Sequence, residues 1–164
     1  MMKAKLVRRE FFLLFVLFIA VFLMGCTQSG EVDKVDAYTT AIDKLYQEDS
    51  GLNGDIKYIA LDTSSIINLD DSERQELLQA LESYGFTVLG MTLEELEEEG
   101  YIKDLFFEEG ILFEIKDETM QGATITMDIS KWRSGLGAIG YDGLIVKYKN
   151  GKWEIVKQGN AWIS

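Results

Sequence analysis

The spacing of apolar residues changes near Gly110, and this change constrains the fold more than any other feature of the sequence. Before Gly110, apolar residues recur at helical spacing, as Val35, Tyr38, Ile42 and Leu45 do on one stripe. After it, apolar residues alternate with other residues, as expected for strands that bury one side; the alternating positions are Ile111, Phe113, Ile115, Ile125, Met127 and Ile129. Helices grouped toward the N-terminus, followed by a run of strands, predict an α+β domain.

Local signals near the expected helix ends support this order of elements. The sequence predicts helices across 34–48 and 72–84, and strands across 56–61 and 86–89. Asp70 or Asp71 is placed to cap the second helix, and Gly85 is placed to end it. Thr92 and Glu95 have the spacing of a capping box for a third, short helix. We therefore expect a single domain with four antiparallel strands at its C-terminal end.

The dipeptide Asn150-Gly151 is the strongest local indication of a hairpin. Asparagine and glycine supply the two positive-φ positions of a type I′ turn between alternating strands. Counting outward from the turn pairs Tyr148 with Trp153 on one face. In outline, the element order resembles the cone-shaped fold of the NTF2-like superfamily, and a cystatin-like arrangement fits nearly as well. The resemblance implies N-terminal helices packed on a curved, mainly antiparallel sheet.

The first 26 residues have the pattern of a signal that directs export. Four basic residues precede an apolar run of 14 residues from Phe11 to Met24, which is short for a bilayer span. The run is followed by Gly25 and by Cys26, the only cysteine of the chain. Leu23-Met24-Gly25-Cys26 resembles the lipobox of bacterial lipoproteins. The resemblance implies that residues 1–25 are a signal peptide.

The same resemblance implies how the rest of the chain is organised. Cys26 would become the acylated N-terminus, 26–33 a lipidated tether and 34–164 a single α+β domain on the extracytoplasmic face of the cell membrane. The alternative is an uncleaved N-terminal anchor in which Cys26 has no role. The segments 131–135 and 162–164 are similar to those of uncharacterised lipoproteins of spore-forming bacteria, which carry no known activity to transfer.

Composition excludes several kinds of chemistry. The chain has no histidine, which removes Ser-His-Asp and Cys-His catalysis and histidine metal sites. One cysteine forms no disulfide within the chain and no multi-cysteine metal site. Without residues 1–25, the chain has 12 basic and 27 acidic residues, a net charge of −15. This charge argues against nucleic acid as a partner and leaves a protein or a small molecule.

The segment around 130–143 is the candidate ligand-binding region. Gly135 to Gly140 matches G-x-G-x-x-G, but no helix is expected after it to receive a pyrophosphate, so we interpret it as a flexible loop between strands. Around these glycines lie four side chains able to hold a sugar, a peptide or another small ligand, namely Trp132, Arg133, Tyr141 and Asp142. The alternative is structural: Trp132 plugs the sheet edge and Arg133 pairs with an acidic neighbour.

No catalytic residue, metal ligand or cofactor site is predicted. Asp49 to Asp55 has part of the pattern of a calcium loop but lacks the carboxylate that would complete it at Ala60, which leaves only an irregular, weak calcium site. The sequence therefore favours a lipid-anchored, non-enzymatic binding or interaction module. A substrate-binding lipoprotein associated with a transporter is an alternative, and a small carboxylate-dependent hydrolase is a less favoured one.

Overall fold

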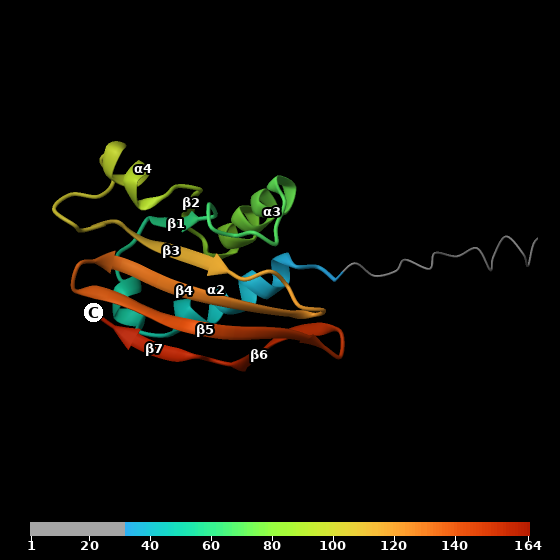
Figure 1. Cartoon of the computed structure of the whole chain (residues 1–164). Helices are drawn as coiled ribbons and strands as arrows, with labels where there is room; N and C mark the ends of the chain where they lie inside the picture. Colours follow the sequence, from blue (N-terminus) through green and yellow to red (C-terminus); the bar gives the residue numbers. More distant parts are fainter. Residues whose placement is uncertain (1–31) are drawn as a thin grey trace, which may run out of the picture. The chain divides into compact units, whose positions relative to one another are not determined.

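The structure is a computed structural model of the chain and describes residues 32–164, which form one compact unit (Figure 1). The expected signal peptide, Cys26 and most of the expected tether lie outside the described residues. Val32 packs against the main core, and the carbonyl of Asp33 accepts a hydrogen bond of 2.6 Å from Trp153. Within 32–164, no helix is both long enough and apolar enough to cross a bilayer.

The described residues contain three α-helices and seven strands, which confirms the α+β class. The helices are α2 (Val35–Gln47), α3 (Asp71–Leu81) and α4 (Leu93–Glu98), with short 3-10 segments η1 (Ser50–Asn53) and η2 (Glu82–Tyr84). The strands are β1 (Tyr58–Asp62), β2 (Thr87–Leu89), β3 (Gly110–Asp117), β4 (Thr124–Ser134), β5 (Gly137–Lys149), β6 (Lys152–Lys157) and β7 (Asn160–Ile163). The last strand, β7, was not expected from the sequence.

The seven strands of this region form one mixed sheet with the order β2-β1-β3-β4-β5-β6. β1 is parallel to both β2 and β3, and the other pairs are antiparallel, so the sheet is mainly antiparallel as expected. β5 is long enough to pair with two strands along one side: β6 pairs with its residues 145–149 and β7 with its residues 139–142. Pairing of β7 places the C-terminal residues at an edge of the sheet, alongside the first part of β5 (Figure 1).

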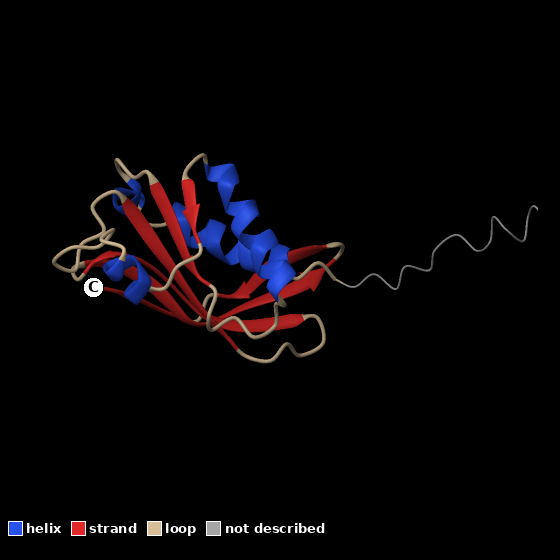
Figure 2. Ribbon diagram, turned by 90° about the horizontal axis from the view of Figure 1, so that it is seen from above, coloured by secondary structure: helices blue, strands red, loops and turns tan. Residues whose placement is uncertain are grey.

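The two faces of the sheet are covered differently (Figure 2). α2 and α3 pack on one face and form the main core with Ile59, Phe113 and Ile129. On the opposite face, which we call the outer face, α4 covers one end of the sheet over a smaller apolar cluster. That cluster consists of Ala60, Leu96, Ile102, Phe107 and Leu112. The rest of the outer face carries no helix among the described residues.

The expected helix caps are confirmed. Asp70 and Glu73 form a reciprocal capping box at the start of α3, and Thr92 and Glu95 form another at the start of α4. Gly85 has a φ of 83° and ends the η2 segment that continues α3. A left-handed residue is needed there because the chain turns from helix into β2.

The C-terminal hairpin has the predicted register. Asn150 and Gly151 have positive φ values of 53° and 86°, as a type I′ turn requires. Tyr148 pairs with Trp153, and their ring centroids lie 5.6 Å apart at 63°. Trp153 is buried, so this pair closes the main core at the β6 side of the sheet.

Candidate functional site

The prediction of a flexible loop at Gly135–Gly140 is wrong, because most of this segment belongs to strand β5. β4 continues to Ser134 and β5 begins at Gly137, so only two residues lie outside the strands. Gly140 is inside β5 and pairs with Ser130 on one side and Trp162 on the other. Glycine is a weak strand former, which is why the sequence pattern favoured a loop.

The four candidate ligand-binding residues do not form one site. Successive residues of a strand point to opposite faces of the sheet. Tyr141 lies on the face covered by α2, where it belongs to the main core with its partner Ile129. Trp132 and Asp142 lie on the outer face. The prediction that these side chains converge is therefore wrong, since strand alternation separates them.

Arg133 and Tyr141 serve the packing of the domain. Arg133 donates to the carbonyls of Leu52, Gly54 and Glu108 at 2.9, 2.7 and 2.7 Å, so the expected pairing with an acidic side chain is also wrong. The Tyr141 hydroxyl donates a hydrogen bond to Glu48. Burial and this hydrogen bond raise the pKa of Tyr141 to about 12, which keeps the phenol protonated at neutral pH.

Trp132 packs against the apolar cluster under α4. It does not plug a sheet edge, because β4 is an interior strand between β3 and β5. Asp142 remains at the outer surface, where it accepts a hydrogen bond of 3.1 Å from the indole of Trp162. Of the four candidates, Asp142 alone lines the pocket described below.

The segment Asp49 to Asp55, which has part of the pattern of a calcium loop, binds the ammonium group of Lys131. The Lys131 side chain is 0% exposed, and its ammonium donates to the carbonyls of Glu48 and Asp49 at 2.5 and 3.2 Å and to Asn53 at 3.1 Å. Desolvation lowers the pKa of Lys131, while the carboxylates of Asp49 and Glu48 act to raise it. The oxygens at the end of α2 are therefore ligands of an ammonium group, whose charge suits a helix C-terminus.

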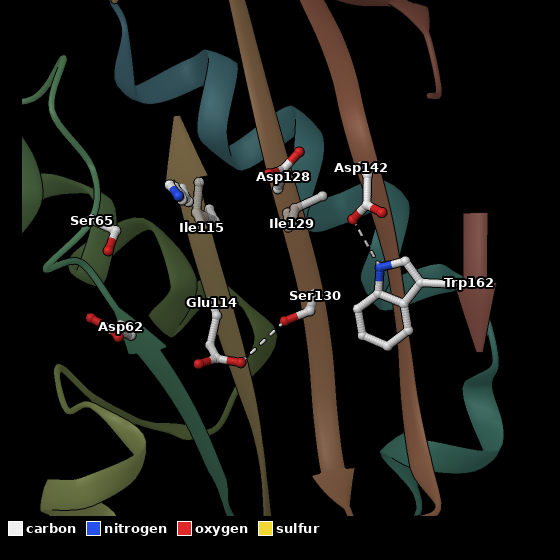
Figure 3. Close-up of a pocket in the computed structure, with 10 residues that line it drawn as sticks. Asp62, Ser65, Glu114, Ile115, Asp128, Ile129, Ser130, Asp142 and Trp162 are labelled. Carbon is white, nitrogen blue, oxygen red and sulfur yellow. Dashed lines mark hydrogen bonds between the residues drawn. The ribbon is translucent and has the colours of Figure 1, made fainter. Parts of the chain in front are cut away.

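A polar pocket of ≈ 250 Å³ lies on the part of the outer face that carries no helix (Figure 3). We call it the outer-face pocket. Its polar lining residues come from β1, the loop after it, β3, β4, β5 and β7; they are Asp62, Ser65, Glu114, Lys116, Asp128, Ser130 and Asp142, with Trp162 beside them. Of these eight residues, Asp142 is the one that the sequence predicts to bind a ligand.

Strand register brings these residues together. Asp62 pairs with Glu114, Glu114 with Ser130, Ser130 with Gly140, and Gly140 with Trp162. These five residues therefore form one row across five strands, from β1 to β7. A second row runs parallel to the first, in which Lys116 of β3 pairs with Asp128 of β4.

The indole of Trp162 lies over Gly140 of β5. Figure 3 shows the ring lying against this strand. A Cβ at residue 140 would approach the indole to 2.5 Å and the carbonyl of Ile129 to 2.8 Å. Glycine is thus required for the ring to lie close to the sheet. Trp162 remains 37% exposed, so an aromatic side chain borders the carboxylates.

The outer-face pocket has an excess of negative charge. It contains four carboxylates and one lysine, and no described lysine or arginine forms an ion pair with any of the four. Partial desolvation raises the pKa of Glu114, the carboxylates of Asp62 and Glu94 raise it further, and a hydrogen bond of 3.3 Å from Ser130 opposes the rise. The negative charge of the neighbouring carboxylates therefore disfavours the ionised form of Glu114.

The carboxylates of the pocket are spread over the sheet. Within residues 32–164, no three acidic or cysteine side chains are placed to hold a metal ion together. Neighbouring strands are about 4.8 Å apart, and alternate residues of one strand are about 6.8 Å apart. The pocket therefore offers several separate negative groups along a surface, with a flat aromatic ring at one end.

Comparison of the chain with protein-family models, with curated proteins and with solved structures finds no significant match.

The sequence contained one signal for this pocket. In β3 and β4, polar residues occupy the positions that alternate with the buried apolar ones, as Glu114 and Asp128 do. This alternation indicates a polar outer face. It does not show which polar residues are neighbours, because that depends on the pairing of strands far apart in the sequence.

Proposed function

We propose that the protein is an extracytoplasmic, lipid-anchored, non-enzymatic binding module whose outer-face pocket binds a ligand with two or more ammonium groups. The observation that carries the proposal is the group of four carboxylates on an uncovered face of the sheet, two of which, Asp62 and Glu114, are direct cross-strand neighbours, with Trp162 at its border. The ligand chemistry is that of a linear polyamine or of lysine side chains along a peptide.

The charge distribution supports an extended cation over a compact one. Asp62 and Glu114 are direct neighbours with like charge, which destabilises the free protein unless a cation lies between or above them. Asp128 and Asp142 add negative charge on β4 and β5. A ligand with separated ammonium groups neutralises such a surface better than one metal ion, and the indole adds a favourable surface for a cation.

Lipid anchoring on Cys26 is supported by the lipobox-like residues that end on it. A domain with a charge of −15 is repelled by anionic lipids, so the acyl chains must hold it at the membrane. A Cys26→Ser variant is expected to appear in the soluble fraction instead of the membrane fraction. Full membrane retention of this variant would show that the anchor is elsewhere.

Binding is tested by calorimetric titration of the full chain, in non-ionic detergent, with the linear tetra-amine spermine. The double variant Asp62→Asn/Glu114→Gln is expected to bind about fivefold or more weakly, because two charge contacts are lost. The matched control is Glu76→Gln/Glu82→Gln, which removes two exposed carboxylates near α3, on the other side of the sheet. Equal weakening by both pairs would mean that spermine responds to net charge alone, and the proposed site would be wrong.

A small hydrolase is a second candidate, favoured by one observation. Glu114 has a raised pKa and lies beside the carboxylate of Asp62, and the general acid of a glycosidase commonly has a raised pKa and a second carboxylate near it. A panel of chromogenic glycosides tests this function. Turnover that disappears in Glu114→Gln would support a hydrolase and replace the non-enzymatic proposal, whereas no turnover would leave binding as the function.

No observation favours the alternative of a substrate-binding lipoprotein associated with a transporter. Proteins in that role usually enclose their ligand between two lobes. The outer-face pocket lies on one sheet of one compact unit.

A further inference from the structure

A second pocket, of ≈ 330 Å³, lies where β1 and β3 begin. It shares no lining residue with the outer-face pocket. We call it the aromatic pocket, and it is lined by Tyr58, Glu99, Gly100, Tyr101, Lys103, Phe106, Phe107, Glu108 and Glu109. Four aromatic rings and three carboxylates therefore surround one cavity.

Three of the rings form a fixed wall. The ring centroids of Tyr58 and Tyr101 lie 5.2 Å apart at 73°, and Phe107 lies 6.4 Å from each of them. Phe107 is buried against Gly110, where any Cβ would overlap its ring. Since these rings hold one another in place, little conformational entropy is lost when a ligand contacts them.

Two of the three carboxylates of the aromatic pocket, Glu99 and Glu108, are not paired with a cation of the described residues. Glu109 forms an ion pair with Lys57. Glu99 and Glu108 have no side-chain hydrogen bond or ion pair to any residue that the structure describes. Lys103 is a cation in the lining, and it has no ion pair with a described residue either. The cavity thus combines an aromatic surface with two carboxylates, Glu99 and Glu108, that have no ion-pair partner among the described residues.

A strained turn shapes the rim of the pocket. Asp104 and Leu105 have positive φ values of 50° and 58°, although neither is glycine or asparagine. Hydrogen bonds in both directions between Lys103 and Phe106, at 3.1 and 2.9 Å, close the turn. Phe106 remains 42% exposed, with the Arg133 guanidinium 5.8 Å from its ring centroid. Strain of this kind persists where the surrounding structure holds it, and such positions cluster at ligand sites.

We propose that the aromatic pocket binds an alkylammonium group, with the cation against the rings of Tyr58 and Tyr101 and near Glu108. Aromatic faces attract organic cations through the ring quadrupole, and quaternary ammonium groups are the ligands that such sites recognise best. The nearby carboxylate supplies charge neutralisation. This site is independent of the outer-face pocket, and the ammonium group belongs either to a small quaternary amine or to a lysine side chain.

The probe is choline, compared with its neutral isostere 3,3-dimethyl-1-butanol, which has the same shape without the charge. Choline is titrated into the full chain in non-ionic detergent while the tyrosine ring signals are followed by NMR. Saturable shifts of Tyr58 and Tyr101 are expected, with an affinity about two- to fivefold or more above that of the alcohol. Equal affinity for both compounds, or no shift, would overturn the proposal.

A second titration, with Nα-acetyl-lysine amide, identifies the source of the ammonium group. Tighter binding of choline assigns the pocket to a small quaternary amine, and tighter binding of the lysine derivative assigns it to a protein side chain.

Two variants with opposite expected effects on choline affinity distinguish a change in binding from a loss of folded protein. Lys103→Met removes a competing positive charge and is expected to tighten choline binding about two- to fivefold, which no misfolded protein would do. Glu108→Gln is expected to weaken it by a similar factor. Lys147→Met, an exposed lysine of β5, is the control for Lys103→Met. If Lys103→Met leaves the affinity unchanged or weaker, the cavity is not a cation site.

The double variant Asp62→Asn/Glu114→Gln keeps the two proposals apart. It is expected to leave choline binding unchanged while it weakens spermine binding at the outer-face pocket. Loss of choline binding in this variant would show that choline is held at the outer-face pocket, and the aromatic pocket would be rejected.

Discussion

The indole of Trp162 lies on Gly140, its partner across β5 and β7, and both residues stand in the same row as Asp62 and Glu114. This contact fixes the border of the outer-face pocket. It also gives the third glycine of the G-x-G-x-x-G match a structural role that has no relation to nucleotides.

Gly140→Ala is expected to displace Trp162 and to lower the free energy of unfolding by about 1–3 kcal/mol, because the added methyl group overlaps the ring and the Ile129 carbonyl. Thermal unfolding and tryptophan fluorescence measure both effects. Gly135→Ala is the control, since nothing lies within 4 Å of a Cβ there. In a double-mutant cycle, Trp162→Ala should reduce the cost of Gly140→Ala, and strict additivity would show that the two residues are not in contact.

Lys131→Met is expected to lower the free energy of unfolding by about 2–4 kcal/mol, because the carbonyls of Glu48 and Asp49 would lose their donor inside the protein. Chemical denaturation checks this value. Lys147→Met on the exposed part of β5 should change stability by less than about 0.5 kcal/mol. Equal small effects of the two substitutions would contradict the role of the buried ammonium as a cap on α2.

Trp153→Ala is expected to lower the free energy of unfolding by about 3–5 kcal/mol, because a large buried ring is removed. The loss includes the contact with Tyr148 and the hydrogen bond to the Asp33 carbonyl. A shift in the melting temperature measures it. An unchanged melting temperature would mean that Trp153 does not close the core.

Glu114→Gln is expected to raise stability at pH 7. The pKa of Glu114 is raised in the folded protein, mainly through desolvation, so its favourable contribution is fully present below pH 4.5 and is lost as the pH rises through the raised value. Above that value the ionised carboxylate opposes folding, and glutamine removes this effect. Melting temperatures between pH 4 and pH 8 should therefore diverge in favour of Glu114→Gln, and the opposite divergence would contradict the sign of the shift.

Local signals predicted the parts of the fold that depend on neighbours in the chain. The capping box at Thr92 and Glu95, the left-handed Gly85 and the hairpin at Asn150-Gly151 each depend on a few consecutive residues, and each is confirmed. The α+β class followed from the change in apolar spacing at Gly110, because each spacing matches one kind of element.

The candidate site needed information that the sequence pattern does not contain. Glycines within 135–140 favour a loop, but Gly140 lies in a strand that pairs with Ser130 of β4 and with Trp162, a residue 22 positions later in the sequence. Asp62 and Glu114 are adjacent only because β1 and β3 pair in parallel after the chain has passed through α3, β2 and α4. Register between distant strands therefore determines the pocket, and alternation alone predicts only a polar face.

The central claim is tested most directly at Glu114, by a ¹³C NMR pH titration of its side-chain carboxyl in the full chain with and without spermine. Without spermine, the pKa of Glu114 should lie above 4.5. Ammonium groups bound in the outer-face pocket favour the ionised carboxylate, so saturating spermine should lower this pKa. A pKa that stays the same in saturating spermine would show that the cation binds elsewhere and would contradict the proposed function.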